Sequence, residues 1–187
     1  MQYMALLNGS AEDATQPGTP EWDAEMAAYG AFDEKYGSVV LGGEALEPAA
    51  VTVRQRDGAP LVVDGPYAET AEATGGYFVI EAPSLDEAIE IAAQIPQAAI
   101  GGVELRPLVV WLDSAPAERG PLPEGTARYL ALIRGKETEA DNPESPEWEP
   151  AAEQHRAFAE AAGSDLWSGM ALHPLATATT VRSRDGE

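Results

Sequence analysis

Hydrophobic residues in the first 112 positions follow strand spacing and helix spacing in turn. Short apolar runs bounded by polar or turn residues predict strands at residues 3–7, 39–41, 51–56, 77–81 and 103–111. Between them, large apolar side chains recur at helical spacing in two places. One set is Trp22, Met26, Tyr29, Phe32 and Tyr36, and the other is Leu85, Ala88, Ile89 and Ala92.

Residues at the ends of these stripes support two helices. Thr19 followed by Pro20 is a favourable start, and Gly37 is a favourable stop. Ser84 and Glu87 form a capping-box pattern, in which each side chain bonds an otherwise unpaired amide. The predicted order is strand, helix, strand, strand, turn segment, strand, helix, strand. This order favours an α+β arrangement, a sheet with helices packed on one face.

The sequence repeats itself at a nearly fixed offset. Tyr3–Leu7 returns as Tyr129–Ile133, an offset of 126 (129 − 3), and Pro20-Glu21-Trp22 returns as Pro146-Glu147-Trp148. After a two-residue insertion, Thr52-Val53-Arg54 returns as Thr180-Val181-Arg182. Matches this dense at a fixed offset predict tandem copies of one structural unit.

The second copy stops at Glu187, where the first is entering the segment Leu61–Pro66. We therefore expect one and a half copies, with the second supplying only its strand, helix, strand, strand half. It should be unstable alone, because it lacks a helix to cover its sheet. The predicted domains are residues 1–112 for the complete copy, 113–127 for a Pro-rich polar linker and 128–187 for the partial copy.

Composition excludes several classes of function. Eleven Lys plus Arg against 32 Asp plus Glu give a net charge of −21, so nucleic acid and anionic membranes should be repelled. No apolar run approaches the roughly 20 residues that span a bilayer. There is no cysteine, hence neither a disulfide nor a thiolate metal site, and a cytoplasmic location fits. The histidines and carboxylates lack the spacing of a metal site, and no glycine-rich phosphate loop is present. We expect no metal or cofactor.

One segment carries a family resemblance. Val63-Asp64-Gly65-Pro66-Tyr67-Ala68-Glu69-Thr70, followed by Gly75-Gly76-Tyr77 and Glu104-Leu105-Arg106-Pro107, resembles the signature of the DGPF branch of the YCII-related family. Tyr67 stands where the family pattern has Phe. The resemblance implies a ferredoxin-like α+β fold of the dimeric α/β-barrel type, with a cleft between sheet and helices. It also implies self-association, which tandem copies could satisfy as an internal pseudo-dimer.

The resemblance implies less about chemistry. Some YCII-like proteins are small lyases or dehalogenases that use a His-Asp pair, and many members have no assigned activity. DGPF members also tend to be encoded beside sigma factors of the extracytoplasmic-function class, which suggests a role in signalling.

Asp64 is the first candidate for proton transfer. In Asp-Gly-Pro the carboxylate can bond local amides, and Pro66 can open a helical turn whose N-terminus favours negative charge. Such contacts would keep Asp64 ionised, able to accept a proton or to orient an imidazole. Pro66, Tyr67 and Glu69 would line the same mouth as ligand-binding residues. The alternative is that Asp64 is only a turn residue.

A His-Asp pair also needs a histidine, and the first copy has none. His155 lies in the predicted helix of the second copy, where YCII-like proteins often carry their histidine, and its counterpart in the first copy is Tyr29. Asp64 and His155 could meet across an interface between copies. Otherwise His155 is a packed or rim residue. Tyr29 is a poor base at neutral pH, and it could contribute to a ligand site or simply to the core.

Two classes of function therefore stay open. The first copy lacks a histidine, which favours a small-ligand-binding or regulatory module without catalytic activity. The alternative is a small-molecule lyase or isomerase in which Asp64, with His155, transfers protons.

Overall fold

The computed structural model describes residues 1–10, 13–65, 72–113 and 124–183. Their contacts divide the chain into two compact units. The first comprises Met1–Arg106 together with Ala178–Glu187, and the second comprises Pro107–Thr177. The predicted domains follow the sequence copies, whereas these two units follow the contacts between residues. The predicted domain boundaries therefore stay predictions.

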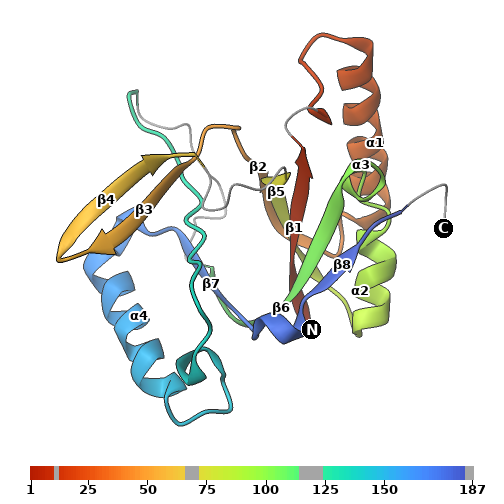
Figure 1. Ribbon diagram of the computed structural model, residues 1–187. Helices are drawn as coiled ribbons and strands as arrows, with labels where there is room; N and C mark the ends of the chain where they lie inside the picture. The colour runs from red at the N-terminus through yellow and green to blue at the C-terminus, as the bar shows by residue number, and fades with distance from the viewer. Residues whose placement is uncertain (11–12, 66–71, 114–123, 184–187) are drawn as a thin grey trace. The chain divides into compact units, whose positions relative to one another are not determined.

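The first unit is built on an antiparallel sheet with the strand order β2-β5-β1-β6 (Figure 1). Tyr3 of β1 lies opposite Ile80 of β5, and Val40 of β2 lies on the other side of the same Ile80. This is the strand order of a ferredoxin-like fold. The bounds are β1 Gln2–Ser10, β2 Val40–Ala45, β5 Glu72–Glu81 and β6 Gly102–Asp113.

Helices cover one face of this sheet. They are α1 (Pro20–Tyr36), α2 (Leu85–Ala92) and the short α3 (Gln97–Ile100). Thr19 caps α1, since its hydroxyl accepts a hydrogen bond from the amide of Trp22 at 3.2 Å. Ser84 caps α2 in the same way, by accepting from the amide of Glu87 at 3.2 Å. The predicted helix starts are confirmed, while α3 was not predicted.

The core lies between these helices and the sheet. Side chains of β1, β5 and β6 alternate, so that every second one enters the core. The buried members are Tyr3, Ala5, Leu7, Phe32, Ile80, Ala82, Ala88, Ile91, Ala92, Ile95, Ala98, Val103, Leu105 and Val181. Met4, Leu6 and Val79 point to the opposite face of the sheet and are also buried. The central strands are therefore apolar on both faces.

A separate hairpin follows β2. It consists of β3 (Val51–Arg56) and β4 (Ala59–Asp64), and Asp57 and Gly58 form its turn with φ of 52° and 79°. Two successive positive φ values are typical of the tight turns that Asp-Gly sequences favour. The sequence predicted β3 and the turn but not β4. Both strands are mostly exposed on the surface of the first unit.

One further strand completes the first unit. Residues Thr179–Val181 form β8, which pairs antiparallel with β6, so that Val181 lies opposite Val103. Val181 is only 7% exposed and belongs to the core. A segment far along the chain is thus part of the core of the first unit.

The second unit contains α4 (Trp148–Ala162) and β7 (Ser168–Leu172), and β7 pairs antiparallel with the second half of β6. Three short 3-10 turns accompany them: η2 (Glu139–Asp141), η3 (Gly163–Asp165) and η4 (Leu175–Thr177). The strand predicted at residues 129–133 is absent, and Figure 1 shows irregular chain there. That part of the prediction is wrong, because β1 forms between β5 and β6, whereas no strand of the described residues pairs with residues 129–133.

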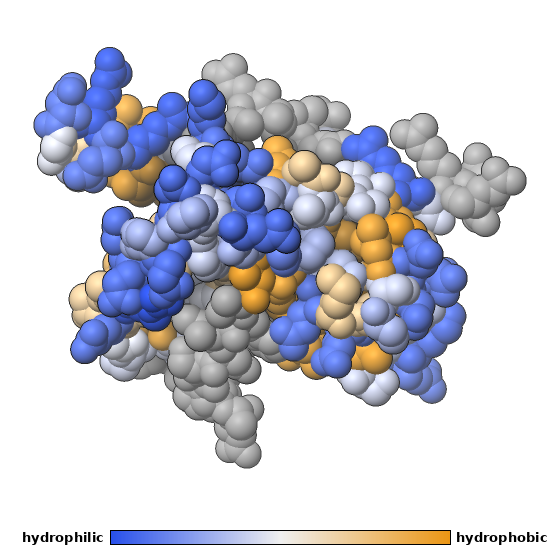
Figure 2. All heavy atoms as spheres, turned by 90° about the horizontal axis from the view of Figure 1, so that it is seen from below, coloured by the Kyte–Doolittle hydropathy of each residue, from blue (hydrophilic) through white to orange (hydrophobic). Residues whose placement is uncertain are grey.

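The protein is thus an α+β protein with an antiparallel sheet. Within the described residues, no helix is both long enough and apolar enough to cross a membrane. In Figure 2, hydrophilic side chains cover much of the visible face, and separate hydrophobic groups lie between them.

Candidate functional site

Asp64 is the last residue of β4, and its side chain is exposed. The backbone that follows it is fixed by Gly65, whose amide donates to the Ala50 carbonyl at 2.8 Å. The Thr52 hydroxyl in turn donates to the Gly65 carbonyl at 2.9 Å. Gly65 has φ of +103°, a conformation that favours glycine over any residue with a side chain. The backbone bends at Gly65, and the turn expected beyond it falls on residues 66–71, outside the described residues.

The rest of the predicted mouth cannot be placed against Asp64. Pro66, Tyr67 and Glu69 lie outside the described residues. The amides expected to bond the Asp64 carboxylate belong to the same segment. Their contact with Asp64 stays a prediction.

Tyr29 lies on α1 and is half-buried among aromatic rings. Its ring centroid is 6.5 Å from that of Phe78, and Phe32 lies between Phe78 at 5.6 Å and Tyr36 at 5.4 Å. Burial, and secondarily the negative charge of Glu25, raises the pKa of Tyr29 to about 12. The phenol therefore keeps its proton at neutral pH and cannot act as a base there.

The two histidines belong to the second unit. His155 is exposed on α4, while His173 is half-buried and its amide donates to the Pro107 carbonyl at 2.9 Å. Asp64 and Tyr29 both belong to the first unit, where no hydrogen bond or ion pair joins the two side chains. A pairing of Asp64 with His155 stays a hypothesis.

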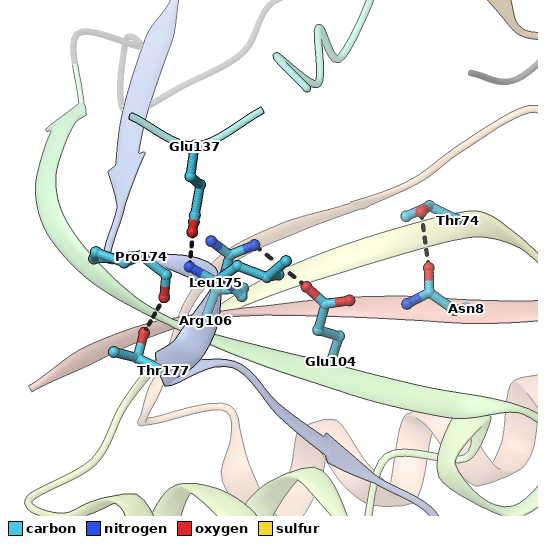
Figure 3. A network of polar contacts seen from close by, with 8 residues as sticks. All are labelled: Asn8, Thr74, Glu104, Arg106, Glu137, Pro174, Leu175 and Thr177. Carbon is cyan, nitrogen blue, oxygen red and sulfur yellow. Dashed lines mark hydrogen bonds and ion pairs between the residues drawn. The ribbon is translucent and has the colours of Figure 1, made fainter. Parts of the chain in front are cut away.

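A polar pair on β6 was not predicted as a site. Because Val103 and Leu105 enter the core, Glu104 and Arg106 point to the opposite face of the sheet. The Arg106 guanidinium lies 3.4 Å from the Glu104 carboxylate, and the two side chains are 14% and 29% exposed (Figure 3). Charged side chains are mostly exposed in folded proteins, so a recessed charged pair is uncommon.

A second polar pair joins β1 and β5. The Thr74 hydroxyl donates to the side-chain oxygen of Asn8 at 2.8 Å (Figure 3). The side-chain amide of Gln97 donates to the backbone carbonyl of Asn8 at 3.0 Å. The strand register shifts between Leu7 and Asn8, which marks a β-bulge. We call these two separate pairs, Asn8–Thr74 and Glu104–Arg106, the polar row (Figure 3). The segment Glu104-Leu105-Arg106-Pro107 was the sequence signal that could have pointed to it.

A recess of about 370 Å³ lies elsewhere in the first unit. It is lined by Met1, Ser38, Val39, Glu81, Ala82 and Pro83. Of the predicted site residues that the structure describes, Asp64, Tyr29 and His155, none lines it. The Met1 amine donates to the Ala82 carbonyl at 2.7 Å. Within the described part of the chain, no cluster of three or more His, Asp or Glu side chains could hold a metal ion.

Comparison with known proteins identifies the family. The fold is α+β with an antiparallel sheet, consistent with a ferredoxin-like fold, and a family model described as "YCII-related domain" matches residues 1–112. The chain belongs to the YCII-related family. It is also similar to "Uncharacterized protein R00369" of Rhizobium meliloti (strain 1021), with 42% identity over 65 residues. That match covers 34% of this chain and 52% of the relative, so the chain spans about half the length of the relative it matches.

Proposed function

We propose that the protein is a small-ligand-binding module and that the polar row is its ligand site. The observation that carries this proposal is the recessed Arg106–Glu104 pair, with its arginine side chain only 14% exposed. Desolvating a charged pair costs free energy that its attraction seldom repays, so such a pair is weak evidence for stability. A function in binding accounts for its position better.

The chemistry of the polar row defines the ligand class. Arginine presents several donors in a planar fork that matches a carboxylate, while Asn8 and Thr74 add neutral donors and acceptors. The chain as a whole carries a charge of −21, which disfavours anions at most of the surface. A recessed guanidinium is a place where a small carboxylate can still be neutralised. The proposed ligand is a small polar molecule that carries a carboxylate.

Tyr29 supports binding over proton transfer. The family resemblance implies a histidine at this helix position, and here the position holds a phenol whose pKa is about 12. A general base works best when its pKa lies near the working pH. The first unit therefore offers recognition chemistry at the polar row and no base at the position of Tyr29.

A thermal-shift screen of the full chain against short mono- and dicarboxylic acids tests the proposal, followed by calorimetric titration of any acid that stabilises it. We expect at least one acid to bind, and we expect Arg106→Gln to weaken its binding by about tenfold or more. Arg56→Gln, at an exposed position of β3, is the matched control and should leave binding unchanged. Equal affinities for the folded Arg106→Gln and Arg56→Gln chains would exclude the polar row.

We also propose that residues 128–187 are a partial second copy of the family domain. Three elements support this. Helix α4 falls within the counterpart of α1 at the offset of 126, and β7 overlaps the counterpart of β2. Strand β8 corresponds to the start of β3 after the two-residue insertion. Unfolding of variants at equivalent positions of the two copies, followed by circular dichroism, compares the copies directly.

A further inference from the structure

Tyr3 carries a buried hydroxyl with a weak partner. Its side chain belongs to the core between the sheet and the helices and is only 1% exposed. The hydroxyl donates to Sδ of Met1 at 3.7 Å. Burial raises the pKa of Tyr3, so at neutral pH the phenol keeps the proton that it donates. A thioether sulfur is a weak acceptor, and a buried donor without a good acceptor costs free energy.

Met1 is fixed beside Tyr3 and yet is open to solvent. Its amine donates to the Ala82 carbonyl at 2.7 Å, and the Ala82 amide donates to the Met1 carbonyl at 2.9 Å. These two bonds continue the pairing of β1 with β5 and hold the backbone of Met1 in place. Met1 is nevertheless 66% exposed and borders the recess of about 370 Å³. A small solute can therefore reach the sulfur that contacts Tyr3.

The other three methionines do not combine these two properties. Met4 is only 3% exposed, and Met170 of β7 is half-buried. Met26 is 40% exposed on α1, but its sulfur accepts no hydrogen bond among the described residues. Exposure decides how readily a methionine is oxidised, so Met1 is the methionine at which oxidation would be both fast and felt by a buried group.

We propose that Met1 is a reversible oxidation site and that the Tyr3 hydroxyl binds the oxygen of its sulfoxide. Neither the polar row nor the tandem copies enter this inference. The substrate is a small peroxide such as hydrogen peroxide. A lone pair of the sulfur attacks one peroxide oxygen, the O–O bond breaks, and the proton of the transferred oxygen passes to the departing hydroxide to give water. The sulfur loses the two electrons that the peroxide gains.

The distance between the two side chains leaves room for the sulfoxide. An O–H···O bond of about 2.8 Å, joined to an S–O bond of about 1.5 Å at an angle of about 120°, places the sulfur about 3.8 Å from the donor oxygen. The sulfur already lies 3.7 Å from the Tyr3 oxygen. The sulfoxide is chiral at sulfur, and from this position only one of the two epimers directs its oxygen at Tyr3. Because the bond to sulfur is weak, it opens readily and exposes both lone pairs to peroxide.

The energetic effect has an unusual sign. Oxidation of a methionine usually disrupts packing, because it makes an apolar side chain polar. Met1 buries little of its surface, so this cost is small here. The gain is a strong acceptor for a hydroxyl that is removed from water. The oxidised chain is therefore expected to be more stable than the reduced chain.

The test uses the full-length chain with Met26→Leu, treated with dilute hydrogen peroxide and mapped by mass spectrometry of its peptides. We expect Met1 to oxidise at least about tenfold faster than Met4, because exposure controls access. The midpoint of thermal unfolding should rise by about 2–4 °C, the shift that one additional buried hydrogen bond gives in a chain of this size. Met1→Leu in the same background controls for oxidation elsewhere and should show no rise.

Tyr3→Phe is the matched variant, because it keeps the buried ring and removes only the donor. Circular dichroism checks that this variant is folded, and its midpoint should not rise on oxidation. The epimers give a second readout that keeps Tyr3 in place. Methionine sulfoxide reductases A and B each reduce one epimer, here with a dithiol as the reductant, and thus leave the other. Only one of the two treatments should abolish the raised midpoint.

Four results would overturn the proposal. Met1 could oxidise no faster than Met4, or its oxidation could leave the midpoint unchanged or lower it. The folded Tyr3→Phe chain could gain as much on oxidation as the chain with Tyr3. Finally, the two reductases could lower the raised midpoint equally. Carboxylate binding at the polar row should be the same in Met1→Leu, so the two proposals can fail separately.

Discussion

Residues 3–7 and 129–133 have nearly the same sequence and opposite structures. Tyr-Met-Ala-Leu-Leu forms the centre of β1, where Tyr3 is 1% and Leu7 is 6% exposed. Tyr-Leu-Ala-Leu-Ile forms no strand, and Tyr129 and Ile133 are 88% and 85% exposed. The difference lies in the neighbours. A strand satisfies its backbone groups through adjacent strands, so an apolar pattern becomes a strand only where those neighbours exist.

The largest expected effect comes from the two equivalent tyrosines. Tyr3→Ala should lower the free energy of unfolding by about 3–5 kcal/mol, because it empties a buried aromatic site. Tyr129→Ala should change it by less than about 0.5 kcal/mol. Urea unfolding followed by circular dichroism measures both. Similar losses for the two variants would mean that residues 129–133 are packed in solution.

The next contrast is between the equivalent valines of β8 and β3. Val181→Ala should cost about 2 kcal/mol, since it removes buried methyl groups from the core of the first unit. Val53→Ala should cost less than about 0.5 kcal/mol in the protein alone. The same unfolding measurement applies, with Val62→Ala as a control for hairpin stability. A loss at Val53 as large as that at Val181 would contradict its exposure.

A smaller contrast concerns how the equivalent helices begin. Thr19 caps α1, so Thr19→Ala should lower the free energy of unfolding by about 1 kcal/mol. Its counterpart Ser145 precedes α4 and accepts from the amide of Glu147 at 3.2 Å, but α4 itself has no side-chain cap at its start. Ser145→Ala should therefore cost less than about 0.5 kcal/mol. Equal costs in chemical unfolding would show that Ser145 works as a cap.

The smallest effect appears only at alkaline pH. The pKa of Tyr29 is raised from its ordinary value of 10.0 to about 12, so the folded state holds this proton more tightly than the unfolded state. Its contribution to stability is complete below pH 10 and is lost as the pH rises from about 10 to 12. Tyrosinate absorbance of the wild type minus that of Tyr29→Phe should rise around pH 12. A rise centred near pH 10 would show that Tyr29 is solvated.

Much of the fold could be predicted from local patterns. The helix from Pro20 to Tyr36 follows from its cap, its proline and its aromatic stripe, and β3 was predicted with its observed bounds. Strand β4 does not follow from the local pattern, because its apolar run comes directly after a tight turn and reads as part of a turn segment. The strand expected at 129–133 was wrong because its formation depends on partners that a local pattern does not contain.

The candidate site was harder to predict than the fold. Asp64 could be proposed from Asp-Gly-Pro, and the structure places it at the exposed end of β4. Arg106 and Glu104 belong to the segment Glu104-Leu105-Arg106-Pro107, which carries part of the family resemblance. Their recessed position, however, depends on which face of β6 enters the core. The pKa of Tyr29 likewise depends on Phe78 and Glu25, which only the folded chain brings close.

The boundary between the two compact units runs inside a strand. Gly102–Arg106 of β6 belongs to the first unit and Pro107–Asp113 to the second, and the first unit also recruits Ala178–Glu187. A gene segment cut at this boundary would divide a hydrogen-bonded strand and leave the first core without Val181. Recombination could therefore not shuffle these units as independent modules. The two parts of the chain are expected to be inherited together and to vary together.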